Sequence, residues 1–228
     1  KEYRRQRQMC IRDSYIQDLP HFADQDDSQI AGIVMNANPF TNGHRYLVEQ
    51  ASKENDHVYV FVVSQEASLF TAAERYQLVQ AGCADLDNVT VVPGGDYMVS
   101  YATFPAYFLK DDQNVAHFQA ALDATLFKEQ IAAPLNITRR YVGSEPFSPT
   151  TDIYNQELTR VLPPEVEVKI LDRAANASQD VISATKVRAA IANDELAVVQ
   201  DYVPQTTLSF IQNHWSDLRA RIKEGSLE

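Results

Sequence analysis

Cysteine, basic residues and long apolar runs are all scarce in this sequence. The two cysteines, Cys10 and Cys83, match no metal-binding or redox spacing, so a reducing compartment is expected. No apolar stretch approaches the ~20 residues needed to cross a bilayer, and the basic, polar N-terminus is unlike a signal peptide. The sequence therefore predicts a cytoplasmic protein with no membrane partner.

Acidic residues outnumber basic ones, 31 against 20, which gives a formal net charge of −11. A protein that binds nucleic acid needs the opposite sign, so no nucleic-acid partner is expected. A small phosphate ligand needs only a local group of donors, and the net charge does not exclude it. The 228 residues are 45% hydrophobic, which suffices for a full core without disulfides or a structural metal.

The first fourteen residues, KEYRRQRQMCIRDS, are unlike the rest, with five Lys/Arg against two Asp/Glu. They resemble a translated adapter at the start of an open reading frame from environmental sequencing. In that case the reading frame of the native chain was also cut at its 5′ end. The alternative is a solvated basic tail. Residues 15–29 are polar and acidic, as in a linker. We therefore expect a tail and linker over residues 1–29 and one domain over residues 30–228.

Short apolar segments alternate with amphipathic ones from residue 30 onward, which predicts an α/β fold with a parallel sheet. The expected strands are Ile30–Met35, His57–Val63, Val89–Val92, Ile137–Val142 and Val166–Leu171. The expected helices are His44–Asn55, Ala72–Gly82, Val115–Ile131, Thr150–Val161 and Ser183–Ala192, then a helical tail whose last helix starts at Val203-Pro204. These elements give a Rossmann-like, doubly wound sheet of five strands with helices on both faces. Ligands of such sheets bind at the carboxyl ends of the strands.

The segment from Asn36 to His44 reads NANPFTNGH and joins the first strand to a helix. Asn38-Pro39 forces a turn, and Gly43 lets a phosphate approach the backbone where N–H groups favour an anion. Thr41 offers a hydroxyl and His44 an imidazole to the same anion. The alternative is that the turn only caps the helix and that His44 is a surface histidine.

A second motif, ISATKVR, runs from Ile182 to Arg188 and opens the helix after the last strand. Ser183 is a natural N-cap. Thr185 and two cations follow in the first turn or so, where positive charge opposes the helix dipole. A polyanion over this helix end would explain them, and the alternative is a capped surface helix with solvated basic side chains.

Two such motifs in this order resemble those of the nucleotidyltransferase superfamily, His/Thr-x-Gly-His and Ile-Ser-x-Ser/Thr-x-x-Arg. The resemblance implies ATP as a ligand, with the first motif at the α- and β-phosphates and the second at the β- and γ-phosphates. It implies catalytic roles for His44, Arg188 and Thr41, the last replacing the first motif histidine. The residues expected to bind ATP are Asn36, Asn38, Pro39, Phe40, Thr41, Gly43, His44, Gly143, Glu145, Ser183, Thr185 and Arg188.

Two further segments support the same resemblance. Phe70-Thr71-Ala72-Ala73-Glu74-Arg75 resembles the superfamily's Phe-Thr-x-x-Glu-Arg helix start, and it is equally an ordinary capping pattern. Gly143-Ser144-Glu145 follows a strand at the place where the superfamily contacts adenosine, although Gly143 could be only a turn residue.

Four stretches resemble the citrate lyase ligase family more closely, and the resemblance covers Ile30 to about Gln212. These stretches are Ile33–Gln50, Ala102–Lys110, Val142–Phe147 and Tyr154–Gln156. The family implies that acetate and ATP form acetyl-AMP, and that the acetyl group passes to a prosthetic-group thiol on the acyl carrier subunit of citrate lyase. Mg²⁺ is expected on the ATP phosphates, with no protein ligands. Members normally carry an acetyltransferase-like domain before this one, and we expect it to be missing here because of the suspected cut.

Two other functions stay open. Phosphopantetheine adenylyltransferase shares TNGH and the Phe-Thr-x-x-Glu-Arg segment, but Ser64–Ser68 lacks its lysine and the middle of this chain is longer. A nucleotide-binding module that has lost catalysis would also keep both motifs. Phe104, Tyr107 and Lys110 form a possible acceptor side, and the alternative is that these aromatic residues belong to the core.

Overall fold

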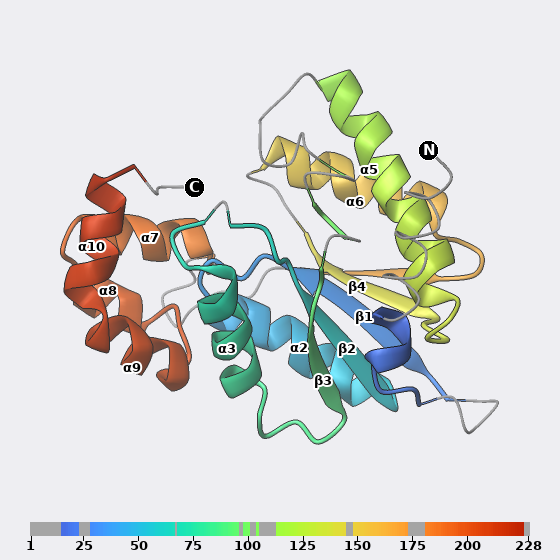
Figure 1. Cartoon of the computed structure of the whole chain (residues 1–228), viewed down its shortest axis with the longest axis horizontal. Coiled ribbons are helices and arrows are strands. Elements are labelled where there is room, and N and C mark those ends of the chain that lie inside the picture. Colours follow the sequence, from blue (N-terminus) through green and yellow to red (C-terminus); the bar gives the residue numbers. More distant parts are fainter. Residues whose placement is uncertain are drawn as a thin grey trace.

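The computed structural model describes residues 15–22, 28–66, 68–95, 98–100, 104, 113–144, 148–172 and 181–225. A five-stranded parallel sheet forms its centre, and helices lie against both faces (Figure 1). The predicted α/β class with a Rossmann-like, doubly wound sheet is therefore confirmed.

The strands are β1 (Ile30–Met35), β2 (His57–Val62), β3 (Val89–Pro93), β4 (Arg139–Gly143) and β5 (Glu167–Leu171). Their order in the sheet is β3-β2-β1-β4-β5. The chain therefore starts in the middle, winds outward to β3, and returns to the other side of β1. β1 pairs with β2 along its whole length, whereas only Ala31 and Gly32 pair with β4. Strand order thus reverses between β1 and β4, where sheets of this kind form a ligand crevice.

Helices from two parts of the chain cover the two faces of the sheet. One face carries α2 (Asn42–Glu54) and α3 (Ala72–Gly82), joined by a C-terminal group of α7 (Ala184–Ala192), α8 (Leu196–Gln200), α9 (Gln205–Asn213) and α10 (Trp215–Lys223). The other face carries α5 (Gln113–Phe127), which continues into the π-helix η1 (Lys128–Ala132), and α6 (Pro149–Val161). Figure 1 shows the C-terminal group beside α3, with α5 and α6 on the opposite side of the sheet.

Side chains of the central strands alternate between two separate hydrophobic cores, one on each face of the sheet. In β2, Val58, Val60 and Val62 pack toward α2 and α3, whereas Tyr59 and Phe61 pack toward α5 and α6. All five side chains are almost fully buried. A strand covered on both faces needs apolar residues at every position, which explains the continuous apolar runs in the sequence.

The bounds of the predicted strands, and of the helices before the tail, lie within two residues of the observed bounds, with one exception. The predicted helix Val115–Ile131 corresponds to α5 and η1 together, because α5 itself ends at Phe127. The helical tail differs, because two helices follow Pro204. Pro204 is the N-cap of α9, and α10 begins after His214, so the prediction that Val203-Pro204 starts the last helix is wrong. The expected linker also contains a packed part, since Ile16 and Leu19 are buried against the α5 face. Within the described ranges, no helix is long and apolar enough to span a bilayer.

Candidate functional site

The first motif forms the connection between β1 and α2, at the carboxyl edge of the sheet. This connection contains the cis peptide bond Asn38-Pro39 and a non-glycine residue, Ala37, with φ of 50°. A positive φ is uncommon for alanine, and backbone of this kind is concentrated at ligand sites. Asn38, Phe40 and Ala37 are at most 4% exposed, so the loop is held within the fold.

Thr41 and His44 form a reciprocal cap at the start of α2. The Thr41 hydroxyl accepts a hydrogen bond from the His44 backbone N–H at 3.4 Å, and the Thr41 backbone N–H donates to Nδ1 of His44 at 3.0 Å. A backbone N–H can only donate, so Nδ1 must be the acceptor. The neutral imidazole then carries its proton on Nε2, which makes Nε2 a hydrogen-bond donor. His44 can therefore cap α2 through Nδ1 and at the same time donate to an anion through Nε2–H.

Phe40 supports the His44 ring from behind. The two rings are stacked with centroids 5.9 Å apart, and Phe40 is fully buried. Behind Phe40 lies Gly82, where an added Cβ would come within 2.4 Å of Phe40 Cε1 and 2.7 Å of its Cδ1. Gly82 is the last residue of α3, as in the predicted helix Ala72–Gly82. Cys83 is the C-cap and Gly82 has no positive φ, so the need for glycine comes from Phe40.

We expect Gly82→Ala to lower the free energy of unfolding by about 1–3 kcal/mol, because the methyl group overpacks a buried ring. Urea denaturation monitored by circular dichroism measures this loss. Gly143→Ala is the matched control, since no atom lies within 4 Å of a Cβ at that position. Equal stability of the two variants would show that Phe40 moves aside at no cost.

The second motif forms the start of α7 and contacts the first motif directly. Ser183 is the N-cap, and its hydroxyl accepts from the Lys186 backbone N–H at 3.2 Å. Arg188 Nη1 donates to the carbonyl oxygen of Asn38 at 2.7 Å, across 150 residues of sequence, and Nη2 lies 3.3 Å from the Thr185 hydroxyl. The structure thus brings together Thr41, His44, Ser183, Thr185 and Arg188 around two helix N-termini.

Gly43 lies in the first turn of α2, beside the second motif. An added Cβ would be 3.5 Å from Ile182 Cγ2 and 3.6 Å from the Thr41 hydroxyl oxygen, which are ordinary contacts. Its φ is also not positive. The fold therefore does not require glycine here, and the open approach to the helix N–H groups is what an added methyl would reduce.

Gly43→Ala is expected to keep or raise the free energy of unfolding, by up to about 1 kcal/mol, because alanine favours helix. The same change should weaken ATP binding about 10- to 100-fold, the equivalent of one lost hydrogen bond to a charged group. Chemical denaturation and isothermal titration with ATP measure the two effects separately. An affinity equal to that of the unchanged chain would place the phosphates away from Gly43.

Arg75 lies beside the first motif, and the sequence did not reveal its contacts. Its side chain is fully buried, and Nη1 donates to Asn36 Oδ1 at 2.6 Å and to Val63 O at 2.7 Å. Nη2 donates to Gln65 O at 2.6 Å. These bonds tie together the carboxyl ends of β1 and β2. Asn36, predicted to contact ATP, is oriented by this guanidinium.

The carboxyl end of β4 presents Gly143 to open space. No atom lies within 4 Å of an added Cβ there, and the Gly143 carbonyl accepts from Asn155 Nδ2 at 2.9 Å. Asn155, on α6, fixes this strand end and was not among the predicted site residues. Glu145, predicted to contact ATP, lies outside the described residues.

The predicted acceptor side is described only at Phe104, because Tyr107 and Lys110 lie outside the described residues. Phe104 is fully buried and stacks on Tyr154 with centroids 5.6 Å apart. Burial and the neighbouring Asp123 carboxylate raise the pKa of Tyr154, so its hydroxyl donates to Asp123 Oδ2 at 2.8 Å. Phe104 therefore packs in the core, and its contact with an acceptor stays a prediction.

The electrostatics at this edge of the sheet differ from the acidic balance of the whole chain. The start of α7 and the Gly43 N–H of α2 offer backbone donors, since the Asn42 N–H donates to the Tyr202 carbonyl at 2.8 Å and the His44 N–H to Thr41. The Arg188 guanidinium lies beside them, whereas that of Arg75 is fully buried and bonded to carbonyl oxygens at the ends of β1 and β2. Together these groups favour a bound polyphosphate. Among the residues with a described placement, no three His, Cys, Asp or Glu side chains are grouped to hold a metal ion.

Comparison with solved structures defines the class of fold. The chain is similar to a putative nicotinate-nucleotide adenylyltransferase from Vibrio parahaemolyticus, with a TM-score of 0.51, 18% identity, and coverage of 84% of this chain and 96% of the other. It is also similar to pantoate-beta-alanine ligase from Francisella tularensis, with a TM-score of 0.51, 14% identity, and coverage of 82% and 74%. The protein therefore has the Rossmann-like fold of the adenylyltransferases.

Sequence comparison then identifies the family. The family model for the citrate lyase ligase C-terminal domain matches residues 30–211. The chain is 42% identical over 193 residues to [citrate [pro-3S]-lyase] ligase of Haemophilus influenzae, covering 82% of this chain and 57% of that protein. The corresponding ligase of Escherichia coli is 38% identical over 192 residues, covering 82% and 54%. This chain belongs to the citrate lyase ligase family, and it spans about half the length of these relatives.

Proposed function

We propose that this protein is an ATP-dependent ligase that activates acetate as acetyl-AMP and passes the acetyl group to the acyl carrier subunit of citrate lyase. The observation that carries the proposal is the 2.7 Å bond from Arg188 to the Asn38 carbonyl, which joins the two motifs at one edge of the sheet. Membership of the citrate lyase ligase family supports the choice of acetate and of the protein acceptor.

The first step needs positioning and charge stabilisation rather than a protein nucleophile. A carboxylate oxygen of acetate attacks the α-phosphorus of ATP, and the bond from that phosphorus to the bridging oxygen of pyrophosphate breaks. The Nε2–H of His44 and the Gly43 N–H would stabilise charge on the α- and β-phosphates. Ser183, Thr185 and Arg188 would hold the β- and γ-phosphates and then the departing pyrophosphate.

The second step transfers the acetyl group. The thiol of the carrier's prosthetic group attacks the acetyl carbonyl carbon and loses its proton to solvent. The bond from that carbon to the phosphate oxygen breaks, and AMP leaves with the oxygen that came from acetate. Magnesium would accompany the nucleotide, bound by phosphate oxygens and water. The described residues fit a metal that arrives with the nucleotide, because Arg188 and the start of α7 offer donors to the phosphate oxygens. We place the reaction in the cytoplasm.

Acetate-dependent exchange of pyrophosphate into ATP tests the proposal. We expect exchange that requires both acetate and magnesium. Exchange or adenylation with phosphopantetheine in place of acetate would instead assign the protein to the phosphopantetheine-type adenylyltransferases. ATP binding without exchange on either substrate would indicate a nucleotide-binding module that lacks catalysis.

A further inference from the structure

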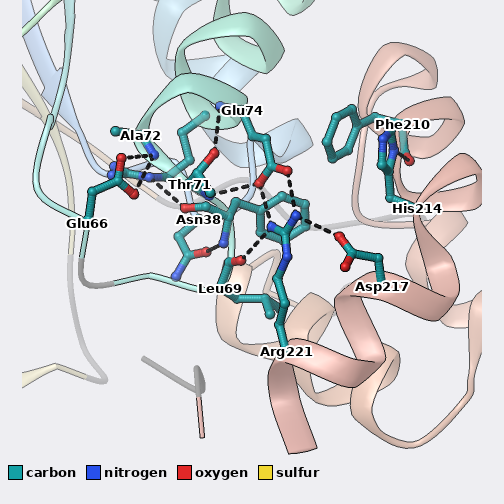
Figure 2. A network of polar contacts seen from close by, with 12 residues as sticks. Asn38, Glu66, Leu69, Thr71, Ala72, Glu74, Phe210, His214, Asp217 and Arg221 are labelled. Atoms are coloured by element: carbon teal, nitrogen blue, oxygen red, sulfur yellow. Dashed lines mark hydrogen bonds and ion pairs between the residues drawn. The ribbon is translucent and has the colours of Figure 1, made fainter. Parts of the chain in front are cut away.

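Arg221, on the last helix of the chain, holds the first turn of α3. Its Nη1 and Nη2 lie 2.8 and 2.9 Å from the two carboxylate oxygens of Glu74, which is a bidentate ion pair. Nη1 also lies 3.3 Å from the Leu69 carbonyl oxygen. Both side chains of the pair are largely buried, with 25% of Arg221 and 16% of Glu74 exposed. Figure 2 shows the guanidinium between α10 and the start of α3.

Glu74 has a second role at the same position. It completes the capping box of α3, because the Thr71 backbone N–H donates to Glu74 Oε2 at 2.8 Å. This oxygen is also bound by Arg221. Burial alone would raise the pKa of Glu74, but the bonds from Arg221 and Thr71 outweigh it and leave the pKa below its usual range. The carboxylate is therefore ionised at neutral pH, and the ion pair and the cap act as one unit.

The segment just before α3 holds the first phosphate motif. The Phe70 backbone N–H donates to Asn38 Oδ1 at 3.1 Å, and both residues are at most 4% exposed. The Asn38 carbonyl in turn accepts from Arg188. A continuous set of contacts therefore runs from Arg221 through the start of α3 to Asn38 and then to Arg188.

We propose that Arg221 is a positioning residue for the nucleotide phosphates, acting through Glu74 and Asn38 on Arg188. The inference rests on the proposed function, and it means that α10 contributes to the geometry of the nucleotide site. The bidentate geometry fixes both the orientation of the first turn of α3 and its distance from α10. A single apolar contact, such as that of Phe70 with Phe210, does not fix both. Arg221 itself does not touch the reacting atoms.

The test compares Arg221→Gln, Glu74→Gln and the double variant in acetate-dependent exchange and in ATP titration calorimetry. Glutamine at position 74 keeps the capping box, so that variant removes the ion pair alone. Each single variant should raise both the Kd and the KM for ATP about fivefold or more, while the KM for acetate stays unchanged. The double variant should be no worse than Arg221→Gln, because Arg221→Gln already removes the pair with Glu74, together with the 2.6 Å pair to Asp217 that Glu74→Gln keeps. Arg221→Lys should restore part of the affinity.

Arg219→Gln is the matched control. Arg219 lies on the same helix, is 31% exposed, and pairs with Asp194 at 2.8 Å, away from Asn38. It should lower the melting temperature less than Arg221→Gln, because only one half-exposed pair is lost, and leave the affinity for ATP unchanged. A folded Arg221→Gln variant with an unchanged affinity for ATP would overturn the proposal. If the unchanged chain shows no exchange with acetate, the proposed function fails, and the calorimetric affinities still decide the role of Arg221.

Discussion

Replacing His44 with alanine should lower the rate of acetate-dependent exchange about 10²–10³-fold, the usual cost of removing one donor to developing negative charge. The reason lies in the ring's orientation, since the Thr41 backbone N–H bonds Nδ1 and thereby assigns the proton to Nε2. A donor fixed in this way needs no reorganisation as charge builds on the phosphates. The initial rate of exchange at saturating ATP and acetate is the measurement.

His44→Gln separates this role from simple helix capping. Glutamine at the same position accepts from the N-cap backbone N–H, as in an ordinary capping box, so the start of α2 is preserved. We expect its exchange rate to fall nearly as far as that of His44→Ala, while its melting temperature stays closer to that of the unchanged chain. Near-normal exchange in His44→Gln would mean that the imidazole is not required, because the glutamine amide also offers a donor.

The fold could be predicted because its main signals are local. Strands buried on both faces produce continuous apolar runs, and the helices of both motifs start at side chains that do cap them, Thr41 and Ser183. The tail was harder, because Pro204 indicates where a helix starts but nothing nearby indicates that it stops at His214. The π-helical turn at the end of α5 likewise left no periodic signal in the sequence.

The candidate site could be predicted only where its residues form motifs. Arg75 and Gly82 belong to the same helix, and each looked like part of an ordinary helix start or end. Their functions depend on residues far away in the sequence, Asn36 for the arginine and Phe40 for the glycine. Sequence spacing cannot show that a guanidinium is fully buried or that a ring lies against a glycine. These contacts join segments that are distant in the sequence, and only the order of the strands in the sheet brings those segments together.

Arg188→Ala should lower kcat/KM for ATP about 10²–10³-fold and raise the KM for pyrophosphate in the exchange reaction. The guanidinium is held by the Asn38 carbonyl at 2.7 Å and by the Thr185 hydroxyl at 3.3 Å, so its plane is fixed between the starts of α2 and α7. A planar fork in a fixed orientation recognises phosphate oxygens in pairs, whereas lysine offers a compact charge. Steady-state exchange with varied ATP and pyrophosphate measures the loss.

Arg188→Lys decides whether orientation or charge matters more. Lysine keeps the positive charge but cannot bond both Asn38 and Thr185 as the guanidinium does, so we expect it to recover only a minor part of the loss. The KM for acetate should stay unchanged in both variants, because the proposed contacts are to the β- and γ-phosphates. A raised KM for acetate with normal ATP kinetics would instead place Arg188 beside the acetate. Full activity with lysine would show that a positive charge at the start of α7 is sufficient and that the bond to Asn38 serves only the fold.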